Sequence, residues 1–131
     1  MKTLIVEDDF TSRLILQALL KTYGPSHIAV DGREAVEAVR LALDAGEHYD
    51  LICMDIMMPR MDGQQSLKEI RALETSKGII YDKTAKIVMT TALSDVKNVS
   101  IAYHSLCNGY LTKPIDKAKL LEVLRELKLI E

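Results

Sequence analysis

The stretch LICMDIMMPRMDG, residues 51–63, decides how the rest of the chain is interpreted. A short apolar run ends at Asp55, and the residues after it include Pro59 and Asp62-Gly63, which are typical of a loop. An apolar run bounded in this way predicts a buried strand of a parallel sheet. A buried carboxylate is costly, but it is tolerated at the carboxyl end of a strand, where open α/β sheets bind their ligands. Taken alone, the pattern also fits an aspartate that only caps its own loop.

The composition indicates one globular domain. The chain has 131 residues, 48% hydrophobic and 27% charged, which is enough for a core of ordinary size. Its 17 basic and 19 acidic residues give a formal net charge of −2 without a basic cluster, so we expect no direct binding of nucleic acid. No apolar run approaches the roughly 18 residues of a membrane span, and Lys2 begins a strand pattern, not a signal peptide. We therefore expect a cytoplasmic protein that does not enter a membrane.

Cysteine and histidine usage argues against a metal site built from these residues. Cys53 and Cys107 stand in apolar surroundings, which favours two buried thiols of a cytosolic protein over a disulfide or a metal pair. The histidines also lack the spacing of metal ligands (His27, His48 and His104).

Five apolar, partly β-branched segments alternate with five segments of helical periodicity. The expected strands are 3–6, 27–30, 51–55, 87–90 and 110–112, and the expected helices are 10–22, 33–44, 64–74, 95–106 and 117–128. This alternation predicts an α/β fold with three layers, in which helices cover both faces of a five-stranded parallel sheet. Because the chain ends with the fifth helix, we expect a single domain over residues 1–131 and no attached second domain.

Three local features refine this prediction. The helix 10–22 has an apolar pattern with Leu14, Ala18 and Tyr23 near one face and Ile15 and Leu19 beside it, and Asp9 is its expected N-cap. The helix 95–106 is the weakest of the five, because it contains poor helix formers. The connection 75–86 exceeds the usual length of about 4–6 residues, and it is either an extended helix end with a harmless insertion or a loop that binds a partner.

Polar residues follow the strands at their carboxyl ends, which meet at one edge of a parallel sheet. They are Glu7, Asp8 and Asp9 after the first strand, Asp55 after the third, Thr91 after the fourth and Lys113 after the fifth. Neighbouring carboxylates raise each other's pKa unless a cation joins them, and a set of oxygen ligands favours Mg²⁺ or Mn²⁺. A hydroxyl and a lysine beside such a cation make a site for a tetrahedral anion, with Asp55 as the nucleophile that attacks phosphorus.

Four segments resemble the receiver domains of two-component response regulators: VED at 6–8, D at 55 followed by MMPRMDG, TTA at 90–92 and YLTKP at 110–114. The resemblance covers the whole chain and implies a flavodoxin-like receiver fold with strand order 2-1-3-4-5. It implies a signalling protein and not an enzyme, which accepts a phosphoryl group from a histidine kinase or a histidine phosphotransfer protein. A stand-alone receiver is the leading interpretation.

The resemblance also implies a role for each matching residue. Asp55 is the expected phosphoacceptor, and the expected metal ligands are Asp8, Asp55 and the backbone carbonyl of Met57, with Glu7 acting through water. Lys113 is expected to bind the phosphate, and its peptide bond to Pro114 is expected to be cis. Thr91 and Tyr110 are the expected conformational switch. Arg13, five residues after Asp8, favours Glu7 and Asp8 as the acid pair, although the pair Asp8 and Asp9 stays open.

The output is less determined by the sequence. The resemblance implies a downstream protein target that binds the fourth helix, fifth strand and fifth helix, at 95–106, 110–112 and 117–128. Met57 and Leu93, two residues after Asp55 and Thr91, are unable to orient a water molecule, so we expect slow loss of the phosphoryl group. Two alternatives remain: a receiver-like module that binds partners without phosphorylation, and the receiver part of a longer regulator with an output domain. A haloacid-dehalogenase-type hydrolase is disfavoured, because Met57 stands where it needs a second aspartate.

Overall fold

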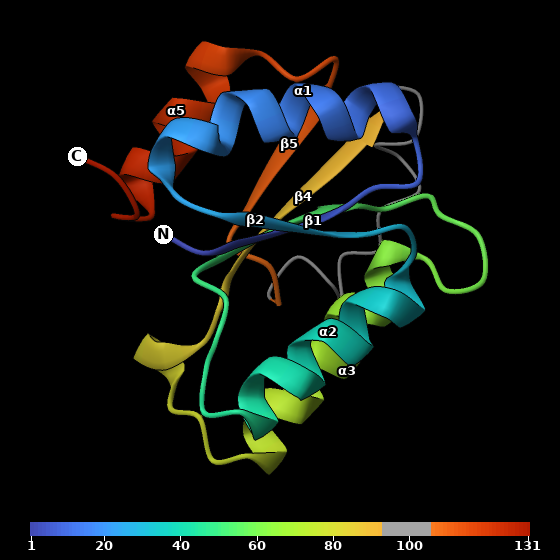
Figure 1. Ribbon diagram of the computed structural model, residues 1–131, viewed down its shortest axis with the longest axis vertical. Coiled ribbons are helices and arrows are strands. Elements are labelled where there is room, and N and C mark those ends of the chain that lie inside the picture. The colour runs from blue at the N-terminus through green and yellow to red at the C-terminus, as the bar shows by residue number, and fades with distance from the viewer. Residues whose placement is uncertain (93–105) are drawn as a thin grey trace.

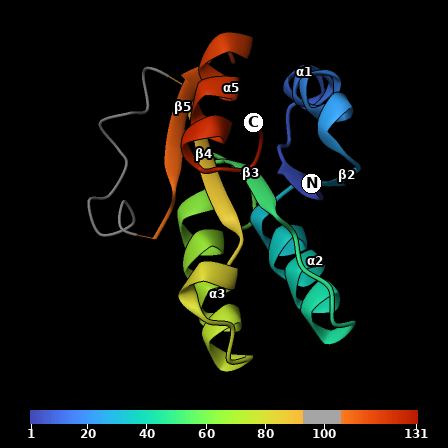
Figure 2. The same ribbon diagram turned by 90° about the vertical axis from the view of Figure 1, so that its left-hand side faces the viewer.

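The computed structural model describes residues 1–92 and 106–131. Its five parallel strands form one sheet in the order β2-β1-β3-β4-β5, which confirms the predicted topology (Figures 1 and 2). The strands are β1 (Thr3–Val6), β2 (Ser26–Ala29), β3 (Leu51–Asp55), β4 (Lys86–Ala92) and β5 (Gly109–Lys113).

Helices cover both faces of this sheet, as the alternating pattern predicts. They are α1 (Phe10–Leu20), α2 (Gly32–Asp44), α3 (Gly63–Ser76) and α5 (Lys117–Glu126), with 3₁₀ turns η1 (Lys21–Tyr23) and η2 (Tyr81–Lys83). Figure 1 shows α1 and α5 on one side of the sheet and α2 and α3 on the other. The predicted helix 95–106 lies almost wholly outside the described residues.

Each of the four helices begins at an aspartate whose carboxylate accepts a hydrogen bond from a backbone N–H of the first turn. These residues are Asp9, Asp31, Asp62 and Asp116, and the acceptor distances to Ser12, Glu34 and Gln65 are all 2.9 Å. The N-terminal N–H groups of a helix have no partner within it, so such a cap stabilises the helix by about 1 kcal/mol. Short polar residues at the ends of the loops therefore determine where the helices start.

The core consists of two apolar layers, one on each side of the sheet. Successive residues of a strand point to opposite faces, so Leu4 and Val6 join the layer under α2 and α3, whereas Ile5 joins the layer under α1 and α5. The residues of β1 and β3 are all buried, as expected for central strands covered on both faces.

The face of α1 that the apolar pattern indicates is not the face that the structure buries. The structure buries Leu16 and Leu20 against the sheet, whereas Leu14 and Ile15 are 49% and 43% exposed and Ala18 is also exposed. The helix has leucine or isoleucine at five of its eleven positions, so more than one apolar stripe runs along it. Periodicity alone does not choose between these stripes, and packing on β1 and α5 does.

The remaining differences are small. The helix α3 continues to Ser76, two residues beyond the expected end, and the connection after it contains the turn η2. β2 begins one residue earlier than expected, and β4 runs on to Ala92. Cys53 is buried as predicted, but Cys107 is only half-buried; neither forms a disulfide.

Candidate functional site

The acidic residues that follow β1 and β3 meet at the carboxyl edge of the sheet. The two strands are paired, with Val6 opposite Met54, so the next residues along each strand come together. Carboxylate oxygens of Glu7, Asp8 and Asp55 all lie within 4.8 Å of one another. Glu7 is fully buried and Asp55 is 6% exposed, whereas Asp8 is exposed. This acid triad is therefore open to solvent on the side of Asp8.

Asp9 points away from the triad and serves the helix instead. Its carboxylate accepts hydrogen bonds from the backbone N–H of Ser12 at 2.9 Å and from the Ser12 hydroxyl at 2.8 Å, and these bonds hold the pKa of Asp9 below its ordinary value. Arg13 donates from Nη1 to the backbone carbonyls of Glu7 and Asp8, each at 3.1 Å. The acids that stand beside Asp55 are thus Glu7 and Asp8, and Arg13 braces their turn.

Lys113, at the end of β5, reaches across to the triad. Its ammonium forms an ion pair with Oε1 of Glu7 and lies 3.3 Å from Oδ2 of Asp55. Burial alone lowers the pKa of Lys113, but the hydrogen bond to Glu7 and the negative charge of Asp55 raise it overall. The lysine therefore stays charged at neutral pH. The peptide bond from Lys113 to Pro114 is cis.

The triad holds more negative charge than Lys113 balances. Burial, the largest cause, and the neighbouring Asp55 together raise the pKa of Glu7 to about 7, although Lys113 acts in the opposite direction. The second oxygen of Glu7, Oε2, is buried and has no hydrogen-bond partner among the described residues. A buried carboxylate oxygen without a partner, beside two further carboxylates, is a setting that a hard cation stabilises. The residues present therefore fit Mg²⁺ or Mn²⁺.

Thr91 and Tyr110 lie on the neighbouring strands β4 and β5. Asp55 is paired with Thr90, so Thr91 is one residue further toward the carboxyl edge; it is 1% exposed, and its hydroxyl donates to the carbonyl of Ala92 at 3.3 Å. Tyr110 is half-buried and packs against the core layer under α3. Burial is the main cause that raises the pKa of its phenol, and a hydrogen bond with the side chain of Cys107 raises it further. This contact with Cys107 was not predicted from the sequence.

The loop after β3 is anchored to the sheet at both of its ends. The N–H of Ile56 donates to the carbonyl of Thr90 at 3.0 Å, and the N–H of Gly63 donates back to the carbonyl of Ile56 at 2.7 Å. A Cβ at Gly63 would collide with the backbone carbonyl of Asp55, so only glycine fits there. The side chain of Met57 is 55% exposed. Leu93, its predicted counterpart after Thr91, lies outside the described residues.

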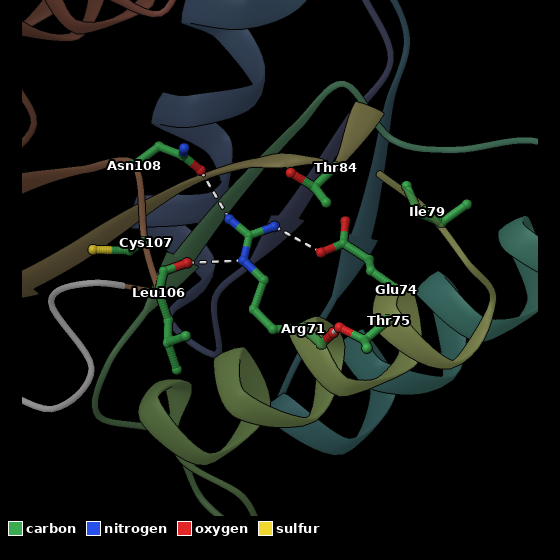
Figure 3. A pocket seen from close by; sticks show the side chains of 8 residues that line it. All are labelled: Arg71, Glu74, Thr75, Ile79, Thr84, Leu106, Cys107 and Asn108. Atoms are coloured by element: carbon green, nitrogen blue, oxygen red, sulfur yellow. Dashed lines mark hydrogen bonds and ion pairs between the residues drawn. The ribbon is translucent and has the colours of Figure 1, made fainter. Parts of the chain in front are cut away.

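A second polar cluster lies at the opposite edge of the sheet, around a cavity of about 300 Å³ (Figure 3). Its centre is Arg71 of α3, which donates to the carbonyl of Leu106 at 2.8 Å, to Glu74 at 2.7 Å and to Oδ1 of Asn108 at 2.9 Å. Arg71 also donates to the carbonyl of Ala85 at 2.8 Å, and Oδ1 of Asn108 accepts from the N–H of Ile87 at 2.7 Å. This network ties α3 to the amino ends of β4 and β5. Sequence reasoning missed it, because Arg71 and Asn108 are 37 residues apart and no local pattern joins them.

Within the described part of the chain, no helix has the length and apolar character needed to cross a membrane.

Comparison with known proteins agrees with the geometry. The family model for the response regulator receiver domain matches residues 3–125. The osmosensing histidine protein kinase SLN1 of Saccharomyces cerevisiae is 37% identical over 127 residues; the match covers 95% of this chain but only 10% of the kinase. The chain thus spans about a tenth of that relative.

Two solved structures share the fold over nearly the whole chain. The receiver domain of sensor histidine kinase PA1611 from Pseudomonas aeruginosa PAO1, with a magnesium ion in its active site cleft, has a TM-score of 0.76 and 27% identity, and 97% of each chain is covered. The receiver domain of Ssk1 from Saccharomyces cerevisiae, crystallised with the histidine phosphotransfer protein Ypd1, has a TM-score of 0.75 and 29% identity, with 95% of this chain and 86% of that chain covered.

Proposed function

This chain belongs to the family of response regulator receiver domains of two-component signalling, and from that premise we propose that Asp55 accepts a phosphoryl group from a histidine of a partner protein. One observation carries the proposal: Asp55, Glu7, Asp8 and Lys113 meet at one edge of the sheet, three carboxylates with a single ammonium group. We further propose that residues 1–131 form one receiver domain.

Each side chain of the site has a defined part in the transfer. An oxygen of Asp55 attacks phosphorus in line with the P–N bond to the donor histidine, and that bond breaks as the new P–O bond forms. The ammonium of Lys113 pairs with a phosphoryl oxygen, and the hydroxyl of Thr91 donates a hydrogen bond to another. Mg²⁺, held by Glu7, Asp8, Asp55 and the carbonyl of Met57, would supply positive charge to the phosphoryl oxygens. The product is an aspartyl phosphate.

The phosphoryl donor is a histidine kinase or a histidine phosphotransfer protein. The similarity to the receiver domain of Ssk1, which was crystallised with such a phosphotransfer protein, supports this choice. The donor has to approach the open side of the triad, next to which α1 begins. Phe10 and Leu14, one helical turn apart on α1, are 64% and 49% exposed, and they offer the donor an apolar docking surface. Cys53 and Cys107 form no disulfide, which suits a cytoplasmic place of action.

Phosphorylation is proposed to change the surface formed by residues 95–106, β5 and α5, which a downstream protein then binds. A phosphoryl group that contacts Thr91 and Lys113 in only one of two conformations shifts the equilibrium toward it. Tyr110 follows Thr91 in this shift, because the two lie on adjacent strands. The chain is therefore a signalling module. It acts either alone or joined to the other domains of a longer regulator.

The test is intact-mass analysis after incubation with phosphoramidate and Mg²⁺. We expect one added phosphoryl mass on the wild type, dependent on Mg²⁺ and absent from Asp55→Asn. The variant Asp44→Asn, at an exposed aspartate of α2, is the matched control and is expected to be phosphorylated like the wild type. The absence of an adduct on the wild type would contradict the proposal and leave a receiver-like module that binds its partners without phosphorylation.

A further inference from the structure

The loop between Asp55 and α3, residues 56–62, carries the backbone that is expected to help bind the cation. Its two ends are fixed by hydrogen bonds to β4 and within the loop itself, but its middle projects from the sheet. Arg60 lies in this middle part with a φ of 65°, a left-handed backbone conformation that residues other than glycine rarely adopt. Such a conformation persists only where the surroundings hold it in place.

The side chain of Arg60 forms an ion pair that stabilises this backbone conformation. Its Nε and Nη2 both lie 2.6 Å from Oδ2 of Asp31. The side chain of Arg60 is 63% exposed, whereas the carboxylate of Asp31 is 2% exposed. The other oxygen of Asp31, Oδ1, accepts the N–H of Glu34 at 2.9 Å as the N-cap of α2. One oxygen of Asp31 therefore fixes a helix and the other fixes the loop.

A backbone hydrogen bond joins the same two segments, and a side-chain hydrogen bond from α3 adds to it. The N–H of Gly32 donates to the carbonyl of Met61 at 3.1 Å, and a Cβ at Gly32 would collide with that carbonyl. The hydroxyl of Ser66 donates to the carbonyl of Gly32 at 2.9 Å. The turn after β2 and the loop after β3 are thus in direct contact, with Arg60 and Asp31 as the charged part of the contact.

The order of the strands places this contact close to the acidic turn that follows β1. β1 lies between β2 and β3, and Glu7 and Asp8 follow β1 directly. The turn after β2 and the loop after β3 are therefore the neighbours of the acidic turn on its two sides in the sheet order, and the ion pair joins these two segments. A movement of the loop would change the distance between its backbone and the carboxylates of the triad.

We propose that the ion pair between Arg60 and Asp31 is a positioning clamp, which holds the loop after Asp55 in the conformation that binds the divalent cation. Neither residue touches the cation or the phosphoryl group. The clamp acts by keeping the backbone near Met57 in place before the cation arrives, so that binding does not have to order the loop. This inference rests on the proposed function of the triad as a cation site.

The experiment compares the wild type with Arg60→Gln, Asp31→Asn and the double variant. Asparagine at position 31 keeps an oxygen for the N–H of Glu34, so the helix cap remains. Arg60→Lys restores the charge, and Arg40→Gln, which removes an exposed arginine paired with Glu37 and Asp44 on α2, is the matched control. Calorimetric titration of the metal-free protein with Mg²⁺ gives the affinity without any phosphorylation step.

We expect Arg60→Gln and Asp31→Asn each to weaken Mg²⁺ binding about tenfold, the lower end of the range for residues that position metal ligands. The double variant should lose no more than either single variant, because both remove one interaction. Arg60→Lys should recover part of the affinity, and Arg40→Gln should bind like the wild type. In phosphorylation by phosphoramidate, the Mg²⁺ concentration for half-maximal rate should rise by the same factor, while the rate at saturating Mg²⁺ stays close to that of the wild type.

Two results would overturn the clamp: an unchanged Mg²⁺ affinity in folded Arg60→Gln and Asp31→Asn, or a lower rate at saturating Mg²⁺ with no shift in the half-maximal concentration. Thermal unfolding identifies a variant that fails to fold. In that case the Mg²⁺ affinity of the other single variant tests the clamp. A wild type that binds Mg²⁺ but is not phosphorylated would instead contradict the proposed function and leave the clamp intact.

Discussion

At the scale of the single residue, Glu7 is the group that makes the site sensitive to pH. It is fully buried, it shares Lys113 with Asp55, and its Oε2 lacks a partner among the described residues. A proton on Glu7 and a cation beside it have the same effect, because each reduces the negative charge of the triad. The two therefore compete.

This competition predicts that Mg²⁺ binds more tightly as the pH rises. Burial raises the pKa of Glu7 from 4.5 to about 7, so below that pH the metal-free residue carries a proton that the cation has to displace. The affinity should increase from about pH 6 to about pH 8 and then level off, with up to one proton released per ion at the lower pH. Calorimetry in two buffers of different ionisation enthalpy measures that proton. Glu7→Gln should bind Mg²⁺ with little pH dependence, and an equally steep dependence in this variant would contradict the assignment.

At the scale of the element, α1 has one leucine in the core beside another at the surface. Leu16 is 2% exposed and Leu14 is 49% exposed. Leu16→Ala should lower the free energy of unfolding by about 2–5 kcal/mol, because it leaves a cavity between α1 and the sheet. Leu14→Ala should change it by no more than about 0.5 kcal/mol. Urea unfolding of both variants checks the pair, and similar losses in the two would contradict the observed orientation of the helix.

The exposed side of α1 has its own consequence for phosphotransfer. If a donor protein docks there, Phe10→Ser and Leu14→Ser should slow transfer from a phosphorylated histidine phosphotransfer protein by about tenfold, the loss expected for central interface residues. The rate with phosphoramidate should not change, since that small donor needs no docking surface. Leu41→Ser, at a leucine of α2 that is 56% exposed, is the control. Equal slowing with both donors would place the effect on Asp55 chemistry and not on docking.

The elements also show what a sequence can and cannot predict. The strands and their order follow from apolar runs and alternation, and the grouping of Glu7, Asp55 and Lys113 follows from the meeting of parallel strand ends. The orientation of α1 was not predictable, because an apolar pattern on several sides of a helix leaves the choice to tertiary packing. The contact of Cys107 with Tyr110 depends on a distance in space that no local pattern encodes.

At the scale of the whole molecule, the two edges of the sheet differ in how their charges are balanced. At the carboxyl edge three carboxylates share one lysine, whereas at the amino edge Arg71 has a hydrogen-bond acceptor for each of its three nitrogens. The carboxyl edge is left with unbalanced negative charge that a ligand can neutralise, and at the amino edge hydrogen bonds join α3 to β4 and to the residues before β5.

Substitutions at the two edges should therefore change stability in opposite directions. Arg71→Met leaves the buried Glu74 without its partner and should destabilise the fold by about 3 kcal/mol or more. Asp55→Asn removes a repelling charge and should raise the melting temperature of the metal-free protein. Calorimetric melting curves in the presence of a chelator measure both. A destabilised Asp55→Asn would mean that the ion pair with Lys113 outweighs the repulsion within the triad.

Oε2 of Glu7 has no hydrogen-bond partner in the part of the chain that the structure describes, and this makes the melting temperature a measure of cation binding. A ligand that binds only the folded chain stabilises it by about 2.7 kcal/mol at a hundred times its dissociation constant. Because the chain has no tryptophan, a dye-based melting assay is the practical readout. A library of divalent ions, phosphoryl donors and phosphate mimics can then be screened without any knowledge of the signalling pathway. A cation that fills the site would raise the melting temperature of the protein.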